Sequence, residues 1–215
     1  MSFQPRNLVL IRHGESEANA ANVFTGTSES VLTHKGEQQM RDVARELAAA
    51  GIYPDRWFLS ALDRARRSVA IINEVMGARS GAVCADAALN ERDYGDLTGL
   101  NKDDAVKRWG PAQVMQWRRS FETAPPGGES LRDTAARVLR YYVRTLLPDA
   151  MAGGNTFVVA HGNSLRALIM ALEGWSPSEI ARFQIETGAA IIYDLANDSR
   201  ACRSDVILPK EHTWP

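Results

Sequence analysis

Two of the four histidines in this chain stand in the same local setting. His13 and His161 each follow a short apolar run, and each precedes a glycine. A neutral imidazole is a good nucleophile toward a phosphoryl group and a good leaving group afterwards. A glycine beside it would let the backbone approach an anion closely. The pattern therefore predicts phosphoryl transfer through a phosphohistidine, with His13 as the nucleophile.

Arginines stand close to these positions in the sequence. Arg12 directly precedes His13, and Arg64 and Arg67 follow Ser60 at the start of a helical pattern. Arginines can neutralise the oxygens of a transferred phosphoryl group and bind them in a bidentate manner. Arg64 and Arg67 could instead form salt bridges on a solvated helix face. For Arg67, a salt bridge and a phosphate contact are equally expected. Zinc binding by the two histidines is disfavoured because no carboxylate stands at ligand spacing, so no metal is expected.

Short apolar runs that end in polar turns are predicted to be buried strands. The predicted strands are Asn7–Ile11, Arg56–Leu59, Thr156–Ala160 and Ala189–Tyr193, with a further edge strand over Cys202–Leu208. In open α/β sheets the ligand site lies beyond the carboxyl ends of the strands. His13, Arg64 and His161 are therefore expected to meet at one edge of the sheet.

Amphipathic helices are predicted between these strands. They cover Thr33–Ala50, Ala61–Met76, Glu129–Leu147 (ended by Pro148) and Ser164–Leu172. Alternation of strands and helices predicts the α/β class, as a three-layer α/β/α domain with a mainly parallel sheet. We expect residues 1–215 to form this single domain. Within it, residues 87–128, with helices over Lys102–Trp109 and Pro111–Ser120, are expected to be an insertion that caps the carboxyl end of the sheet.

The composition excludes several classes of protein. The 215 residues carry a net charge of −1, so no overall field favours nucleic acid or an anionic membrane. No apolar run approaches the roughly 20 residues of a membrane span, and no signal peptide is recognised at the start. A cytoplasmic soluble protein is expected. Cys84 and Cys202 lack metal-ligand spacing and are expected to be reduced and semi-buried.

The segment Leu10–Ser16 reads LIRHGES and resembles the signature of the histidine phosphatase superfamily, which pairs Arg-His-Gly with a late second histidine. Other segments resemble the cofactor-dependent phosphoglycerate mutases: Asn19, Phe24–Gly26, Leu32–Glu37, Leu89–Lys102, Trp117–Ser120, Gly128–Leu131 and Ala160–Arg166. The resemblance covers residues 7–195 and implies a phosphoglycerate mutase-like fold with one antiparallel strand near the edge of the sheet.

The resemblance also implies roles for individual residues. Five match catalytic positions: His13 as nucleophile, His161 as its partner, Glu91 as general acid and base, and Arg12 and Arg64 as ligands of the phosphoryl group. A second set matches contacts with the substrate's phosphate and carboxylate groups: Ser16, Asn19, Thr25, Gly26, Arg92, Tyr94, Lys102, Arg118, Arg119, Gly162 and Asn163. Read alone, Lys102, Arg118 and Arg119 would be a solvated charge run.

The implied reaction interconverts 3-phosphoglycerate and 2-phosphoglycerate, as in glycolysis and gluconeogenesis. Phosphorylated His13 would give its phosphoryl group to one hydroxyl, and the resulting 2,3-bisphosphoglycerate would return its other phosphoryl group to His13. 2,3-Bisphosphoglycerate is thus the expected cofactor, as primer. It carries up to about five negative charges, which fits the many cationic site residues. Small-molecule phosphoglycerates are the expected partners. Members of the family form dimers or tetramers, compact ones also monomers, and a homodimer is expected here.

Some positions depart from the mutase pattern. Ala18 stands where a tryptophan is common, Thr27–Ser30 replaces a loop that contains an aromatic residue, and the chain after Leu208 is short. A less closed site would admit water and favour hydrolysis of the phosphohistidine. The first alternative is therefore a histidine phosphatase that hydrolyses small phosphorylated metabolites. The second is a phosphoryl-binding module without turnover, although mere binding would not need His13, His161 and Glu91.

Overall fold

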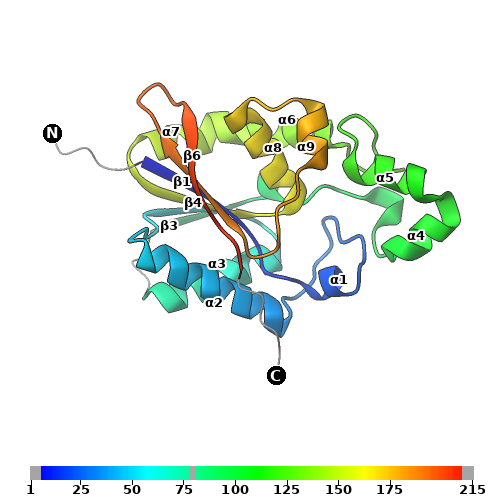
Figure 1. Ribbon diagram of the computed structural model, residues 1–215, viewed down its shortest axis with the longest axis horizontal. Coiled ribbons are helices and arrows are strands. Elements are labelled where there is room, and N and C mark those ends of the chain that lie inside the picture. The colour runs from blue at the N-terminus through cyan, green and yellow to red at the C-terminus, as the bar shows by residue number, and fades with distance from the viewer. Residues whose placement is uncertain (1–5, 78–80, 210–215) are drawn as a thin grey trace.

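The centre of the protein is a six-stranded sheet. The computed structural model describes residues 6–77 and 81–209. The strands are β1 (Arg6–Arg12), β2 (Arg56–Ser60), β3 (Ala82–Asp86), β4 (Gly154–Ala160), β5 (Ala190–Leu195) and β6 (Ala201–Ile207). They lie in the order β3-β2-β4-β1-β5-β6 (Figure 1). β3, β2, β4 and β1 are parallel, and β5 is antiparallel to both β1 and β6. The mainly parallel sheet with one reversed strand next to the edge is confirmed.

Helices cover both faces of this sheet (Figure 1). The helices are α1 (Glu17–Ala20), α2 (His34–Ala49), α3 (Asp63–Met76), α4 (Lys102–Trp109), α5 (Pro111–Arg119), α6 (Leu131–Tyr141), α7 (Leu147–Met151), α8 (Gly162–Glu173) and α9 (Pro177–Arg182). Short 3₁₀ turns are η1 (Ala87–Leu89) and η2 (Gly95–Leu97), and a π-helical segment is η3 (Tyr142–Leu146). The predicted three-layer α/β/α arrangement is confirmed.

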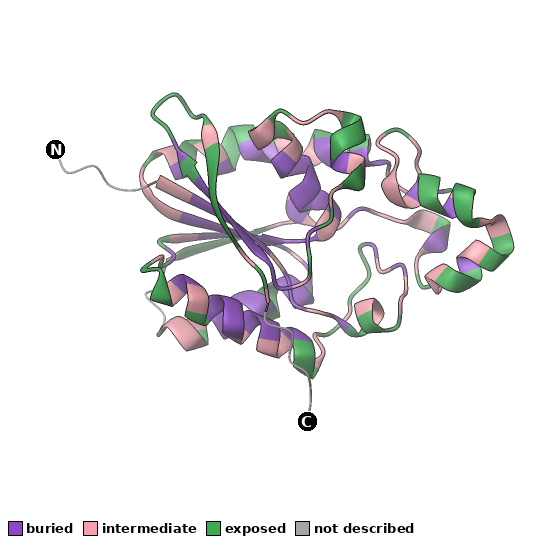
Figure 2. Cartoon of the chain, viewed as in Figure 1, coloured by how far each residue is buried: buried purple, intermediate pink, exposed green. Residues whose placement is uncertain are grey.

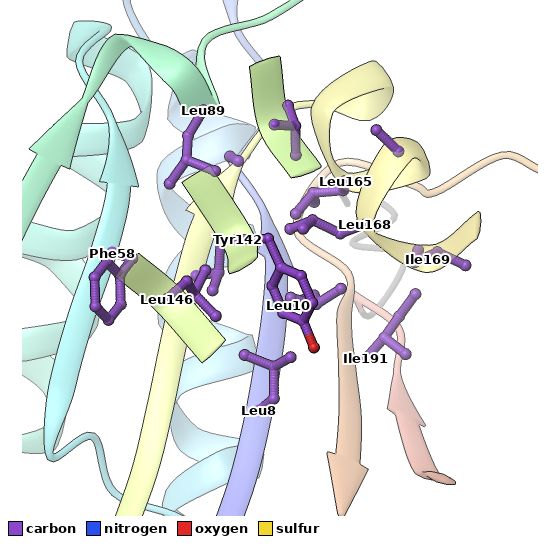
Figure 3. Packing of buried hydrophobic residues seen from close by; sticks show 14 of the residues in the cluster. Leu8, Leu10, Phe58, Leu89, Tyr142, Leu146, Leu165, Leu168, Ile169 and Ile191 are labelled. Atoms are coloured by element: carbon purple, nitrogen blue, oxygen red, sulfur yellow. The ribbon is translucent and has the colours of Figure 1, made fainter. Parts of the chain in front are cut away.

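Strand β1 separates two hydrophobic cores. Leu8 and Leu10 face the core shared with α6 and α8, whereas Val9 and Ile11 face the core shared with α2 and α3. Side chains of a strand alternate between the two faces, so a strand covered on both faces must be apolar throughout. This is why the sequence of β1 contains a continuous apolar run. The strands at the centre of the sheet are buried along their length (Figure 2), and Figure 3 shows the packing around Leu8 and Leu10.

Residues 87–128 form the end of the molecule to which α4 and α5 belong (Figure 1). Helix α4 is capped by Asn101, whose side chain accepts hydrogen bonds from the backbone of Asp103 and Asp104. A third apolar cluster lies here: Phe24, Leu97, Ala105, Val114 and Trp117. Phe24 belongs to the loop that follows α1, so that loop and the α4–α5 segment pack together.

Strand β3 was not predicted. It is a five-residue strand at the edge of the sheet, and its residues Ala82 to Ala85 are exposed. Its sequence contains four consecutive apolar residues without alternation, and so short a run does not distinguish a strand from other structure. The prediction for the two cysteines was only partly right. Cys84 on β3 and Cys202 on β6 are free as expected, but both are exposed, and the predicted semi-burial is wrong.

The predicted helix end before Pro148 is also wrong. Helix α6 passes through the π-helical segment η3 into α7, which contains Pro148 in its first turn and ends at Met151. Proline lacks a backbone N–H and is tolerated in the first turn of a helix, where no donor is needed. The wider π turn ends one regular helix and begins another, which gives Pro148 such a position.

Two further expectations concern the segment after Leu208 and membrane-spanning helices. The short segment after Leu208 lies, from residue 210 on, outside the described residues. No helix in the described parts of the chain has both the length and the apolar character needed to cross a membrane.

Candidate active site

The two histidines meet at the carboxyl ends of β1 and β4. His13 follows β1, His161 follows β4, and their ring centroids are 4.8 Å apart with the rings tilted by 60°. Both side chains are buried. Because β1 and β4 are adjacent and parallel, the residues that follow them must lie side by side. The predicted meeting of His13 and His161 is therefore observed.

His13 has one defined tautomer. Its Nδ1 lies 2.7 Å from the backbone oxygen of Gly14. A carbonyl oxygen can only accept a hydrogen bond, so Nδ1 carries the hydrogen and Nε2 carries a lone pair. Burial, followed by the charges of Arg12 and Arg64, lowers the pKa of His13 well below its ordinary value. His13 is therefore a neutral imidazole with an available Nε2 at neutral pH, as a nucleophile requires.

A pocket of about 330 Å³ opens at this edge of the sheet. Most of the residues predicted for the site line it: Arg12, His13, Asn19, Thr25, Gly26, Arg64, Glu91, Tyr94, Lys102, Arg118, Arg119, Gly162 and Asn163. Its wall thus combines many cationic side chains with few carboxylates. Such a wall favours a small ligand with several negative charges.

Three predicted site residues are not part of the pocket wall. Ser16 is buried and caps α1 by accepting a hydrogen bond from the Asn19 backbone. Arg92 is completely buried, and its guanidinium lies 4.7 Å from the centre of the Tyr94 ring. His161 is buried beside His13. These residues can act on a ligand in the pocket only from behind its wall or after a small displacement.

Several buried nitrogens around the site have no hydrogen-bond partner within the described residues: Arg12 Nε, Arg92 Nε and Nη1, and His161 Nδ1. A buried polar atom without a partner costs about 1–3 kcal/mol. Native proteins keep such atoms mostly where a ligand or water completes the bonding. An anion with several oxygens would supply acceptors for the guanidinium N–H groups, so these atoms fit a phosphorylated ligand.

The arginines differ in how they are held. Arg12 donates from Nη1 to the Ile185 carbonyl at 2.5 Å. Arg64 donates to the carbonyls of Ser28 and Gly26 at 2.8 and 2.9 Å, so part of its guanidinium anchors the loop that differs from the mutase pattern. Arg67 stays outside the pocket and forms an exposed ion pair of 2.6 Å with Glu37. The alternative in which Arg67 forms a salt bridge is therefore confirmed.

Glu91 is oriented by two backbone donors. Its Oε1 accepts hydrogen bonds from the N–H groups of Arg92 at 2.7 Å and Asn163 at 3.1 Å. Its Oε2 lies on the side of Gly162, where a Cβ built on that glycine would be 3.7 Å away. Oε1 is therefore occupied by two hydrogen bonds, and Oε2 remains to exchange a proton with a ligand. The backbone N–H of Asn163 thus binds Glu91, while Asn163 also lines the pocket as predicted.

Glycine follows both histidines, but not for the expected reason in both cases. A Cβ on Gly14 would lie 2.2 Å from the Gly36 backbone oxygen, so Gly14 allows the start of α2 to pack against the loop after β1. A Cβ on Gly162 would make only ordinary contacts, with Glu91 and Arg12. Gly14 is thus required by packing, and Gly162 borders the pocket.

One part of the pocket wall was not predicted. Residues Gln184 to Thr187, just before β5, line the pocket together with Val23, Phe24 and Arg166. Because β5 is antiparallel to β1, its amino end lies at the carboxyl edge of the parallel strands. The only sequence signal was the Thr187-Gly188 turn before β5. Arg166 is buried and donates to Asn163 Oδ1 at 3.0 Å, which fixes the orientation of that amide.

Lys102 should make ligand binding depend on pH. Burial, followed by the charges of Arg118 and Arg12, lowers the pKa of Lys102 to about 8. Above that pH the free enzyme loses this positive charge, so binding an anion then requires proton uptake. We expect KM for an anionic substrate to rise about tenfold per pH unit above pH 8, with kcat nearly constant. Steady-state kinetics between pH 7 and about 9.5 would measure this.

Two variants of Lys102 separate the contributions to this effect. Lys102→Met should raise KM about 10–100-fold at neutral pH, the value of one charge-assisted hydrogen bond, and remove the pH dependence. Lys102→Arg keeps a charge that does not titrate in this range and should give a flat profile. A wild-type profile in which KM stays constant to pH 9 would contradict the assignment.

Arg137 on α6 holds the segment that carries Glu91. Its guanidinium donates to the backbone oxygens of Ala88, Asn90 and Glu91 at 2.9–3.0 Å. The same guanidinium pairs with both carboxylate oxygens of Glu129, at 2.9 and 2.8 Å. One side chain thereby satisfies three carbonyls next to the site.

Arg137→Lys should lower both activity and stability. Lysine cannot reproduce the fork, and each buried carbonyl left without a donor costs about 1–3 kcal/mol. We expect kcat to fall about 10–100-fold and the unfolding temperature to fall as well, as measured by kinetics and calorimetry. Arg132→Lys is the matched control on the same helix, because its pair with Glu122 is 62% and 61% exposed. Equal effects of the two substitutions would contradict the positioning role.

The chain belongs to the histidine phosphatase superfamily. The family model described as histidine phosphatase superfamily (branch 1) matches residues 8–205. Two relatives carry the name 2,3-bisphosphoglycerate-dependent phosphoglycerate mutase. The one from Mesorhizobium japonicum is 50% identical over 202 residues, which cover 94% of this chain and 98% of the relative. The one from Afipia carboxidovorans is 52% identical over 194 residues, or 90% and 94% of the two chains.

Solved structures with the same fold carry the names of phosphatases. The α-ribazole phosphatase from Shigella flexneri is 25% identical, with a TM-score of 0.78 and coverage of 92% of this chain and 94% of that one. A mycobacterial glucosyl-3-phosphoglycerate phosphatase is also 25% identical, with a TM-score of 0.78 and coverage of 93% and 97%. The fold is thus shared by mutases and phosphatases, and the choice between them depends on the relatives of higher identity and on the pocket.

Proposed function

We propose that this protein is a 2,3-bisphosphoglycerate-dependent phosphoglycerate mutase, which interconverts 3-phosphoglycerate and 2-phosphoglycerate. The observation that carries the proposal is sequence identity: two relatives with that name are 50% and 52% identical to this chain, over at least 90% of both sequences. The pocket supports it independently. Beyond the arginines next to His13, it contains Lys102, Arg118 and Arg119, which would have little use with a small ligand of one anionic group.

The proposed catalytic cycle uses His13 and Glu91. Phosphorylated His13 gives its phosphoryl group from Nε2 to a substrate hydroxyl, while Glu91 Oε2 takes the hydroxyl proton. The N–P bond breaks as the O–P bond forms. After the bisphosphorylated ligand has reoriented, the other phosphoryl group passes to His13 Nε2, and Glu91 returns the proton to the leaving oxygen. Arg12 and Arg64 neutralise the phosphoryl oxygens throughout.

2,3-Bisphosphoglycerate fits this site as the primer. The Nε–H group of Arg12, which has no partner among the described residues, and the cationic wall suit a ligand with about five negative charges. The expected absence of a metal requirement stays a prediction, and activity in EDTA tests it. Among the described residues, no group of three or more His, Cys, Asp or Glu side chains could hold a metal ion.

The decisive experiment follows 3-phosphoglycerate conversion in EDTA, coupled to enolase, with and without a trace of 2,3-bisphosphoglycerate. Free phosphate is measured in the same samples. We expect conversion that the primer stimulates, with little phosphate released. Release of phosphate without isomerisation would overturn the mutase and favour the alternative, a phosphatase acting on small phosphorylated metabolites.

The homodimer and the cytoplasmic location also stay predictions. The exposed edge of β3, with Val83 58% exposed, offers one surface through which two copies could associate. Sedimentation equilibrium would test the dimer, and a monomer at all concentrations would exclude it.

A further inference from the structure

His161 uses only one of its ring nitrogens in the protein. Nε2 lies 2.7 Å from Ser60 Oγ. Nδ1 is buried, and although His161 is the N-cap of α8 and its side chain lies toward the Ser164 backbone, Nδ1 forms no hydrogen bond with the described residues. His161 and Ser60 are both completely buried, so solvent does not complete the bonding. The nitrogen that carries the hydrogen in neutral His161 depends on whether the serine hydroxyl donates or accepts in this contact.

Asn90 sets the direction of the Ser60 hydroxyl. One side-chain atom of Asn90 lies 2.8 Å from Ser60 Oγ and 3.0 Å from the backbone nitrogen of Ala61. Since that N–H can only donate, the Asn90 atom is the amide oxygen Oδ1. Ser60 must therefore donate its hydrogen to Asn90. Its Oγ is left to accept from the Leu62 N–H, at 3.2 Å, and from His161 Nε2.

The position of Asn90 is itself fixed by the clamp on α6. Arg137 Nη1 donates to the Asn90 backbone oxygen at 3.0 Å. The chain of contacts therefore runs from the Arg137 guanidinium through Asn90 and Ser60 to His161, and each donor in it has one defined direction. His13 and His161 are consequently held in opposite tautomers, with the hydrogen on Nδ1 in His13 and on Nε2 in His161.

We propose that Ser60 and Asn90 are positioning residues that keep a hydrogen on His161 Nε2, so that His161, after a small displacement from behind the pocket wall, meets the bound phosphoryl group as an imidazolium through Nδ1. With Nε2–H committed to Ser60, a further proton can enter only at Nδ1 of a ring whose centroid lies 4.8 Å from that of His13. That proton comes from solvent when the anion binds and returns to solvent when it leaves. The proposal rests on the proposed phosphoryl-transfer site, but not on mutase turnover.

The surroundings of His161 support this change of charge. Burial, followed by the electrostatic effects of the His13 ring and of the charged Arg64, Arg12 and Arg137, lowers the pKa of His161 well below its ordinary value. These groups face it from the end of β1, from α3 and from α6, and all of them oppose a positive charge. His161 is thus neutral in the free protein. An anion in the site reverses the balance, and a charged donor then forms a stronger hydrogen bond than a neutral one.

Nitrogen NMR of the ¹⁵N-histidine-labelled protein tests the proposal directly, with sulfate as the probe. Sulfate keeps two charges near neutral pH, so any proton taken up belongs to the protein. We expect the Nε2–H tautomer of His161 without sulfate and protonation of both nitrogens with it. In Asn90→Ala the Ser60 hydroxyl can turn toward Nε2, so His161 should move toward the Nδ1–H tautomer and no longer become doubly protonated.

Kinetics give a second reading through a double-mutant cycle. Ser60→Ala and Asn90→Ala should each lower kcat about tenfold with KM little changed, because a charge-assisted bond in the transition state is weakened. If one chain of contacts is responsible, the double variant should be no worse than either single variant. The matched control is Thr156→Val on β4, which removes a buried hydroxyl that has no partner among the described residues. This substitution should change neither the tautomer of His161 nor kcat.

The outcomes separate this proposal from the proposed function. Wild-type His161 observed as the Nδ1–H tautomer, or left singly protonated by sulfate, would overturn it whatever the enzyme catalyses. Additive losses of kcat in the cycle would do the same. If the protein gave the expected NMR result but did not interconvert the two phosphoglycerates, the proposal for His161 would stand and the proposed mutase function would be overturned.

Discussion

We expect His13→Ala to lower kcat at least about 10⁴-fold, the largest effect of any single substitution in this protein. His13 is the neutral imidazole whose Nδ1 is committed to the Gly14 carbonyl at 2.7 Å and whose Nε2 is available in the pocket. Without it, the phosphoryl group has no covalent acceptor. Incubation with radiolabelled 2,3-bisphosphoglycerate should label the wild-type protein with one acid-labile phosphoryl group and leave His13→Ala unlabelled.

Two controls sharpen this prediction. His34→Ala, at the start of α2 and outside the pocket wall, should retain both label and activity. The pH profile is the second control. Because the pKa of His13 is lowered, its neutral form persists below the range of about 6–7 in which an exposed histidine titrates, so kcat/KM should show no loss there. Labelling of the alanine variant would place the nucleophile elsewhere.

The inner strands were predictable from the sequence because they are covered on both faces. Burial on both sides requires a continuous apolar run, and β1 and β4 show it. β3 was not predicted, because its run of four apolar residues shows no alternation and is too short to distinguish a strand from other structure. The continuation of the chain past Pro148 depends on a π-helical turn, and turn type of this kind depends on packing that local propensity does not describe.

The centre of the site was predictable because sheet topology positions it. Residues that follow adjacent parallel strands must meet, which brings His13 and His161 together. The contribution of Gln184 to Thr187 required knowing that β5 is the reversed strand. The resemblance implied one antiparallel strand near the edge of the sheet, but it did not say which strand that is.

How a side chain is used was harder to predict than where it lies. Arg64 was expected at the phosphoryl group and lines the pocket, but it also donates to two loop carbonyls. Arg92 was expected to touch the substrate, but it is completely buried outside the pocket wall, with its guanidinium over the Tyr94 ring. Hydrogen-bond partners of this kind depend on loop conformation, which residue type and spacing do not determine.

Glu91→Gln should give the second-largest loss, about 10²–10⁴-fold in kcat, with KM little changed. The amide keeps the size of the side chain and can still accept from the backbone of Arg92 and Asn163, which hold Oε1. It cannot take a proton from the accepting hydroxyl or return one to the leaving oxygen. Substrate binding should therefore survive while the transfer step slows, as steady-state and single-turnover kinetics would report.

The leaving group distinguishes proton transfer from mere positioning by Glu91. Phosphoryl transfer from p-nitrophenyl phosphate to His13 expels a phenolate that needs no proton, whereas transfer from a phosphoglycerate expels an alkoxide that does. Glu91→Gln should therefore slow His13 phosphorylation by the phenyl ester far less than phosphorylation by 2,3-bisphosphoglycerate. Glu122→Gln, at a carboxylate that is 61% exposed, should slow neither reaction. Equal losses with both donors would mean that Glu91 shapes the site through Arg92 and Asn163 and does not carry the proton.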